Sequence, residues 1–383
     1  MLAAWNRLRI WWSSMWTQVC RFWSSEGPAG DCFWLLDFLL LLAVLQFFDS
    51  SQTKSETAFQ IVLDVIKVTV VCLVGVRVLL IVSLEKPITS LRKSITSDRV
   101  NSGDRAFDEL EYRRFNKSGR AMLLIIYGLI IIDTILLSIP NPMKDSVLEL
   151  PPQLCRVGKQ MSGVFYFAFV GFIALSMIPR MFCSLACSGI LLMGLRLKLK
   201  MLTHRYKTII EYPFLDADRY YSRVDREVQN VVDQQLECWS QLQVLKDCVG
   251  KQFFMVHYFA VFAIGALLFV CQDMGLNILS VAIVTTTMGF LLEYYLWCAL
   301  VDSLQDEAQT IGYLIFELCA KIPYIHKYRH QYKRLQTSLM ITWINTGNGL
   351  KMNCMGLFEI SKVSFVYLLN VAYKVLMFLI NMN

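Results

Sequence analysis

The chain has 383 residues, of which 56% are hydrophobic, and its mean hydropathy is +0.47. The apolar residues come in runs too long for a soluble core, which favours a membrane protein over two or three soluble domains. The net charge of +7 comes without a basic groove lined by aromatic side chains, so nucleic-acid binding is not indicated.

Residues 1–30 are expected to form a short amphipathic helix on the membrane surface. Indole rings favour the headgroup layer and arginines favour anionic lipid. Four tryptophans share one helical face and three arginines lie off that face or at its edge: Trp5, Trp12, Trp16 and Trp23, with Arg7, Arg9 and Arg21. The alternative is a mobile tail.

Residues 31–383 are expected to form an all-α transmembrane domain with seven spanning helices. Each spanning helix corresponds to an apolar run long enough to cross most or all of a bilayer. The seven runs are 33–48, 59–84, 119–139, 163–195, 253–271, 277–301 and 354–382.

The lysines and arginines between these runs predict the orientation of the chain. Of the 37 such residues, 29 lie in the N-terminal tail and in the stretches 85–120, 180–252 and 302–351, whereas the alternate stretches contain 4. The other four lie inside the runs: Lys67, Arg77, Lys362 and Lys374. Positive residues remain on the cytosolic side. The N-terminus is therefore expected in the cytosol and the C-terminus outside, which is opposite to a G-protein-coupled receptor.

Two connections on the expected cytosolic side are long enough to form helical extensions that serve as an anchor, 196–252 and 302–353. The first is expected to form two helices broken near Pro213, with Asp216 or Asp218 capping the second. Both extensions carry apolar helical faces, which need partners. The partners are each other, within one chain or across an oligomer, and the alternative is a docking site for another protein.

Several features expected of enzymes and metal proteins are missing from the sequence. There is no P-loop, dinucleotide fingerprint, HExxH or GxSxG motif, so no enzyme activity and no cofactor are expected. The 12 cysteines form no Cys-x-x-Cys pair, and most lie in or beside apolar runs, so no disulfide framework or zinc site is expected. His326 and His330 lack a third ligand, so no metal site is expected there.

The last apolar run, 354–383, carries a polar stripe. At about 100° per residue, Tyr367, Asn370, Lys374 and Asn381 share one helical face. Lipid offers no hydrogen-bond partner, so such a stripe must face protein or water. It is either buried against neighbouring helices or lines a pore.

Charged residues within the other runs also need partners. Asp64, Lys67 and Asp133 are ionisable groups inside expected spanning helices. They form either a structural ion pair or part of a ligand pocket.

Two stretches resemble the insect gustatory and odorant receptors. CALVDSLQDEAQTIGYL over 298–314 is similar to the end of helix six in that family, and CMGLFEIS over 354–361 is similar to the G-x-F-x-[IL]-[DN] entry to helix seven. The resemblance implies a multi-pass plasma-membrane receptor. Four subunits, identical or related, would form a ligand-gated cation channel that responds to small organic compounds of the taste type.

The end of helix seven departs from the family pattern of Thr-Tyr, five hydrophobic residues, Gln and Phe. Matching by distance from Gly356 places Asn381 at the Gln and Lys374 at the Thr, whereas matching by residue type places Leu379 at the Gln. Either way a lysine enters the outer half of the helix. It opposes cation conduction if it faces the pore, and leaves conduction intact if it reaches the outer headgroups.

The resemblance implies two sets of site residues. The pore-lining candidates are Tyr367, Asn370, Lys374, Phe378 and Asn381. The ligand-binding candidates are Asp133, Tyr166, Phe169, Phe262 and Thr285. Aromatic walls with one polar anchor suit a small, mostly apolar ligand. The alternatives are a membrane scaffold of the same fold without channel activity and, with less support, a G-protein-coupled receptor.

Overall fold

The computed structural model describes residues 58–97, 99–139, 159–214 and 216–382. The N-terminal segment 1–30 and the first expected span lie outside these residues. The chain divides into two units, and the larger one contains Leu73–Ile139 and Val170–Met382. The described part of the smaller unit is helical, over 58–72 of α3 and 159–169 of α8.

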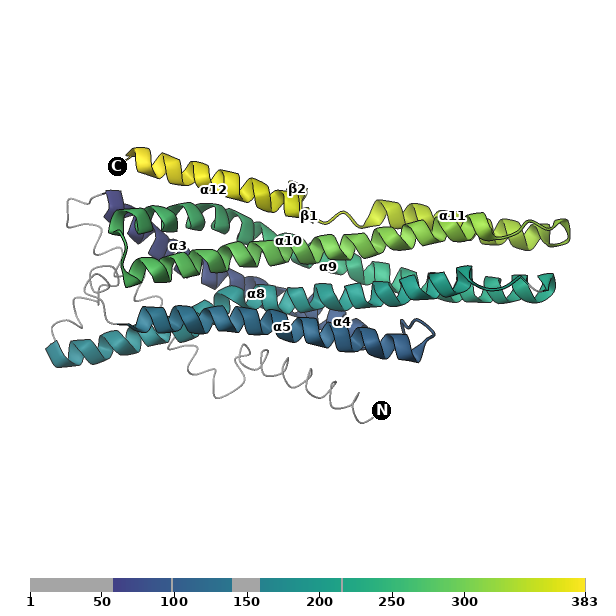
Figure 1. The fold of residues 1–383 in the computed structure, drawn as a ribbon, viewed down its shortest axis with the longest axis horizontal. Coiled ribbons are helices and arrows are strands. Elements are labelled where there is room, and N and C mark those ends of the chain that lie inside the picture. The colour runs from purple at the N-terminus through teal and green to yellow at the C-terminus, as the bar shows by residue number, and fades with distance from the viewer. Residues whose placement is uncertain (1–57, 98, 140–158, 215, 383) are drawn as a thin grey trace. The chain divides into compact units, whose positions relative to one another are not determined.

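The described residues are almost entirely helical (Figure 1). The elements are α3 (Ala58–Ser83), α4 (Glu85–Thr96), α5 (Arg105–Ser138), α8 (Lys159–Ile210), α9 (Ala217–Met274), α10 (Ile278–Lys321), the 3₁₀ turn η1 (His326–Tyr328), α11 (Arg329–Gly349), strands β1 (Asn353–Cys354) and β2 (Phe358–Glu359), and α12 (Lys362–Met382). Five of the described helices are long and apolar enough to cross a membrane, and the C-terminal part of α3, Cys72–Ser83, is a shorter apolar stretch. The chain is therefore an all-α, multi-pass membrane protein, as the sequence predicts.

Expected spans and extensions join into continuous helices. The expected break near Pro213 is confirmed, because α8 ends at Ile210 and α9 begins at Ala217. The Asp216 side chain caps α9 by accepting from the Asp218 backbone N–H at 3.3 Å. From there α9 runs unbroken to Met274, so the extension and the span form one rigid rod.

A tight turn joins α9 to α10. Gly275 has φ of +67°, a conformation that favours glycine. The Asn277 side chain then accepts from the Ser280 backbone N–H at 2.9 Å and starts α10. Because the turn is short, α9 and α10 lie antiparallel and side by side (Figure 1).

The core of the larger unit lies around α9, which packs against α10, α11, α12 and α4. Tyr294 and Trp297 of α10 are fully buried beside Phe253 of α9. Phe358 of β2 closes the same cluster, with its ring centre 6.3 Å from that of Phe253. The hairpin before α12 thus packs against the core through Phe358.

The expected anchor is held together by buried polar contacts as well as apolar faces. The Tyr206 hydroxyl of α8 donates to Gln235 Oε1 of α9 at 2.6 Å, and Gln235 Nε2 donates to Thr346 Oγ1 of α11 at 2.7 Å. These contacts tie three helices together in one register. The apolar face expected in 302–351 is also buried, at Ile311 and Ile315.

A second buried contact fixes the loop between α4 and α5. Lys198 of α8 is only 2% exposed, and its Nζ donates to the backbone oxygens of Ser97 at 2.8 Å and Val100 at 3.3 Å and to the Tyr112 hydroxyl at 3.1 Å. A charged group buried this deeply is stable only when its donors are satisfied. The three acceptors satisfy Lys198.

The last helix begins later than the sequence predicts. A helix was expected from Cys354, but α12 begins at Lys362 and a small hairpin precedes it. Asn353 pairs with Glu359 and Cys354 pairs with Phe358. The turn between the strands needs positive φ at Met355 and Gly356, +47° and +82°, which a helix does not accommodate.

Candidate functional site

The helix α12 packs against the larger unit through one narrow face. Leu368 and Ala372 are buried on that face. Opposite them on α9 lies Gly265, where an added Cβ would lie 2.7 Å from Val375 Cγ1 and 3.1 Å from the Ala372 backbone oxygen. Real Cβ atoms essentially never approach another atom within 3.0 Å, so the contact with Val375 would force a shift. Glycine at this position therefore allows α12 to pack against α9.

A carboxylate from α10 holds the start of α12. Asp302 Oδ2 accepts from the Lys362 backbone N–H at 3.0 Å and lies 3.9 Å from Lys362 Nζ. A helix start carries unsatisfied N–H groups and partial positive charge, and a carboxylate stabilises both. The Ser364 hydroxyl adds a bond to the Glu359 backbone oxygen at 2.6 Å. Asp302 therefore links α10 directly to the first turn of α12.

The five pore-lining candidates all lie on the exposed side of α12. Tyr367 and Phe378 are each 63% exposed, and Asn370, Lys374 and Asn381 are exposed as well. At about 100° per residue the five fall within about 80° of one another. The larger unit therefore does not bury the polar stripe, and the interpretation of a stripe packed against neighbouring helices of the same chain does not hold within the described residues.

The rest of the exposed side of α12 is apolar. Val366, Leu369, Tyr373 and Met377 are 64%, 41%, 59% and 39% exposed. They cover a different sector of about 80°, next to the polar stripe. The free surface of α12 thus has two halves, an apolar strip suited to lipid and a polar stripe suited to water or a narrow aqueous passage.

Of the ligand-binding candidates, Asp133 has the most informative surroundings. It is 6% exposed, and its Oδ2 accepts from the Thr286 hydroxyl of α10 at 2.7 Å. Its Oδ1 is buried and has no hydrogen-bond partner among the described residues. Another ligand-binding candidate, Thr285, donates to the Val281 backbone oxygen at 2.9 Å.

The other ligand-binding candidates are less informative. Phe262 is half-buried on α9. The side chains of Tyr166 and Phe169 lie outside the described part of the chain. The hydrogen-bond partner of Asp133 is Thr286, which was not among the candidates.

The structure also contains a buried ion pair between α3 and α10 that was not predicted from the sequence. The Arg77 guanidinium donates to the Glu293 carboxylate at 2.9 Å, and the two side chains are 2% and 1% exposed. Arg77 also donates to the Met181 backbone oxygen of α8. The sequence indicates that each residue needs a buried partner, because each is charged and lies inside an apolar run.

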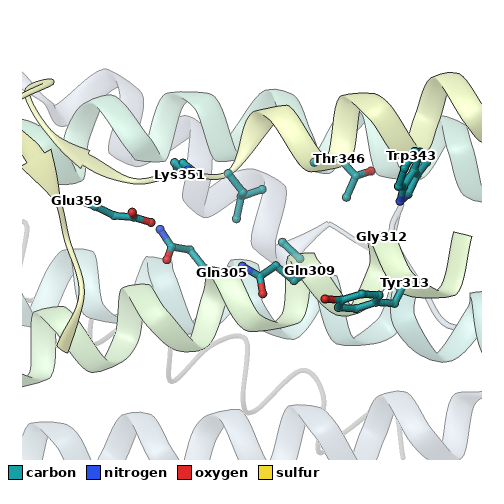
Figure 2. Close-up of a pocket in the computed structure, with 11 residues that line it drawn as sticks. Gln305, Gln309, Gly312, Tyr313, Trp343, Thr346, Lys351 and Glu359 are labelled. Atoms are coloured by element: carbon teal, nitrogen blue, oxygen red, sulfur yellow. The ribbon is translucent and has the colours of Figure 1, made fainter. Parts of the chain in front are cut away.

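A pocket of about 210 Å³ lies between α10 and α11 (Figure 2). Its wall includes Tyr313 and Trp343, and its polar end includes Gln305, Lys351 and Glu359. In Figure 2 the Gln305 amide and the Glu359 carboxylate point toward one another. Because Glu359 belongs to β2, the pocket borders the hairpin that leads into α12. Within the described residues no group of three or more metal-ligating side chains is present.

No protein-family model and no curated protein sequence matches this chain significantly. Solved structures do match. The insect olfactory receptor OR5 from Machilis hrabei aligns with a TM-score of 0.66 and 11% identity over 86% of this chain and 83% of that receptor. The same receptor in complex with eugenol aligns with a TM-score of 0.70 and 11% identity, over 91% and 88%. The resemblance found in the sequence is therefore confirmed in three dimensions: this chain has the fold of an insect olfactory receptor.

Proposed function

We propose that the chain is a chemoreceptor-like subunit of a ligand-gated ion channel in the plasma membrane, with seven spanning helices, a cytosolic N-terminus and an external C-terminus. The observation that carries the proposal is the exposed polar stripe on α12. An apolar helix that presents two asparagines and a lysine away from its own chain needs protein or water to receive them.

The proposal includes assembly into a tetramer, homomeric or with related receptors. Exposed apolar side chains on α10 and α11 support it, because they are available to neighbouring subunits: Phe316, Met340, Ile341, Trp343 and Ile344. Surface patches of this kind mark protein contacts. Four copies around one axis would bring the stripes of four α12 helices together.

The ligand is a small organic compound, and taste-type compounds are the class implied by the sequence resemblance. The solved receptor with the same fold is in complex with eugenol. In this chain Asp133 offers a polar anchor between α5 and α10, because no described residue donates a hydrogen bond to its Oδ1. A ligand that binds one conformation better than the other shifts the equilibrium by that difference in affinity.

In this proposal, α10 transmits the effect of ligand binding to the pore helix. Thr286, which binds Asp133, and Asp302, which caps α12, lie on the same continuous helix. A small displacement of α10 at Thr286 would therefore reach the start of α12. This gives two positions on α10 different roles, Thr286 at the ligand and Asp302 at the pore helix.

The experiment is current recording from cells that express this chain alone, at rest and during a chemical panel that includes eugenol. Surface expression and native mass in lipid are measured in parallel. Current that appears with a compound, changes with Asp133→Asn and stays unchanged with the exposed Thr208→Ala would support the proposal. A monomeric protein at every concentration, or a tetramer at the surface that stays silent with every compound, would contradict it.

One observation favours a second candidate, a membrane scaffold of the same fold. Lys374 lies in the exposed stripe, and a lysine there opposes the cation conduction that the resemblance implies. The silent tetramer described above is the outcome that this candidate expects.

A further inference from the structure

We infer that Lys374 forms a ring of positive charge on the pore axis and makes the pore selective for anions. The inference rests on the proposed function, that α12 lines the pore of a tetramer, and it names the class of ion that passes. It replaces the cation selectivity that the sequence resemblance implies.

The first support is that no described residue neutralises the charge of Lys374. Its side chain is exposed, and it forms no ion pair or hydrogen bond within the described residues. The other lysine of α12, Lys362, lies at the start of the helix with its Nζ 3.9 Å from Asp302 Oδ2. The helix Lys362–Met382 contains no aspartate or glutamate, so no carboxylate of α12 compensates Lys374.

The second support is the direction of the side chain. Lys374 lies in the middle of the polar stripe, between Asn370 and Phe378, and the adjacent apolar strip contains Val366 and Tyr373. If the apolar strip faces lipid, the polar stripe is turned toward the axis. The opposite arrangement would place a lysine and two asparagines in lipid, which is costly.

The third support is depth. Lys374 lies eight residues before Met382, or about 12 Å from the outer end of the helix at a rise of about 1.5 Å per residue. A lysine this far inside is less able to extend its ammonium to the outer headgroups than one in the last turn. Its charge therefore remains within the narrow part of a pore lined by α12.

A ring of lysines inside a narrow passage raises the concentration of anions and lowers that of cations. Channels use rings of acidic side chains to select cations and rings of basic side chains to select anions. The passage has low-dielectric walls, so salt screens these charges less than it screens charges at a surface. Asn370 and Asn381 add amide N–H groups on the same stripe, which donate to an anion.

The test is the reversal potential of purified full-length protein in planar bilayers, with eugenol as the probe compound. A tenfold dilution of NaCl on one side moves the equilibrium potentials of Cl⁻ and Na⁺ by about 59 mV in opposite directions. The reversal potential of the wild type is expected to move toward that of Cl⁻. Movement toward that of Na⁺ would overturn the inference and leave the proposed function intact.

Three variants locate the selectivity. Lys374→Gln removes the charge and is expected to lose the preference for anions, and Lys374→Glu is expected to reverse it. Lys333→Gln removes an equal charge from an exposed position on α11 and is expected to change nothing. A wild type that is silent while Lys374→Gln conducts cations would overturn the inference, because the lysines would then block the pore instead of passing anions.

A double variant separates position from charge. Lys374→Val with Tyr373→Lys keeps a lysine at nearly the same depth but moves it about 100° around the helix to the apolar strip. Loss of anion selectivity in this variant supports the ring, and unchanged selectivity overturns it. No current from any variant, with tetramers confirmed in the membrane, overturns the proposed function and the inference together.

Discussion

Replacing Glu293 with leucine is expected to destabilise the protein strongly, because it leaves the Arg77 guanidinium buried without its counter-ion. The two side chains are 2% and 1% exposed, and three hydrogen bonds of 2.9 to 3.2 Å join them. Removing one partner of a buried pair costs about 3–5 kcal/mol. The remaining bond from Arg77 to the Met181 backbone oxygen offsets only part of that cost.

Removing both partners is expected to restore most of the stability. The double variant Arg77→Met with Glu293→Leu replaces the pair with apolar side chains of similar length, and such replacements are often neutral or stabilising. Glu293→Gln is expected to fall between wild type and Glu293→Leu, because its amide oxygen still accepts from the guanidinium.

The assay is equilibrium unfolding in mixed detergent micelles, followed by tryptophan fluorescence. The quantity compared is the free energy of unfolding of wild type, the two single variants at position 293 and the double variant. Glu293→Leu within about 0.5 kcal/mol of wild type would refute the reasoning, since surface changes lie in that range. A double variant as unstable as Glu293→Leu would show that packing, and not the unpaired charge, causes the loss.

The remaining predictions concern α12 and the anchor. Asp302→Ala removes the cap of α12 and should cost about 1 kcal/mol in the same assay and change the resting current, whereas Asp302→Asn should keep most of both. Gly265→Ala should cost about 1–3 kcal/mol through overpacking, and Gly128→Ala, where an added Cβ meets nothing within 4 Å, should not. Tyr206→Phe leaves Gln235 Oε1 without its donor and should cost about 1–3 kcal/mol of unfolding free energy. Burial raises the pKa of the Cys354 thiol to about 11, so thiol reagents at neutral pH should label it only after unfolding, as mass spectrometry would show.

One helix break and one helix cap could be predicted from the sequence. The break near Pro213 and the cap at Asp216 depend on local chemistry, which a short stretch of sequence contains. The helix α10 extends well beyond its expected end at Val301 because its hydrophobicity falls there while its helical periodicity continues. Hydropathy marks where lipid ends, and a helix does not have to end there.

Pairings between distant segments could not be predicted. Arg77 and Glu293 are 216 residues apart, and nothing in either local sequence specifies the other. Similarly, positions 285 and 286 are both threonine. Which of them faces Asp133 depends on the rotation of α10 against α5, and in the structure it is Thr286. The hairpin before α12 was missed because two-residue strands leave almost no periodic pattern.

The polar stripe of α12 was predicted correctly as a shared face, because helical periodicity alone defines it. Its exposure could not be predicted, since burial depends on which face α9 occupies. Gly265 of α9 has no side chain, so the face of α12 that carries Ala372 and Val375 packs there. The function of the stripe stays a prediction that only current recordings test.

The most direct test of a pore lined by α12 is the reactivity of cysteines introduced along it. Asn370→Cys and Phe378→Cys place thiols on the polar stripe. The controls Val366→Cys and Tyr373→Cys place thiols on the apolar strip. All four variants are opened with the compound that opens the wild type. A charged methanethiosulfonate reagent is expected to alter the current irreversibly at the two stripe positions and to leave the controls and the wild type unchanged. Equal modification at all four positions, or none at the stripe, would contradict a pore lined by this face of α12.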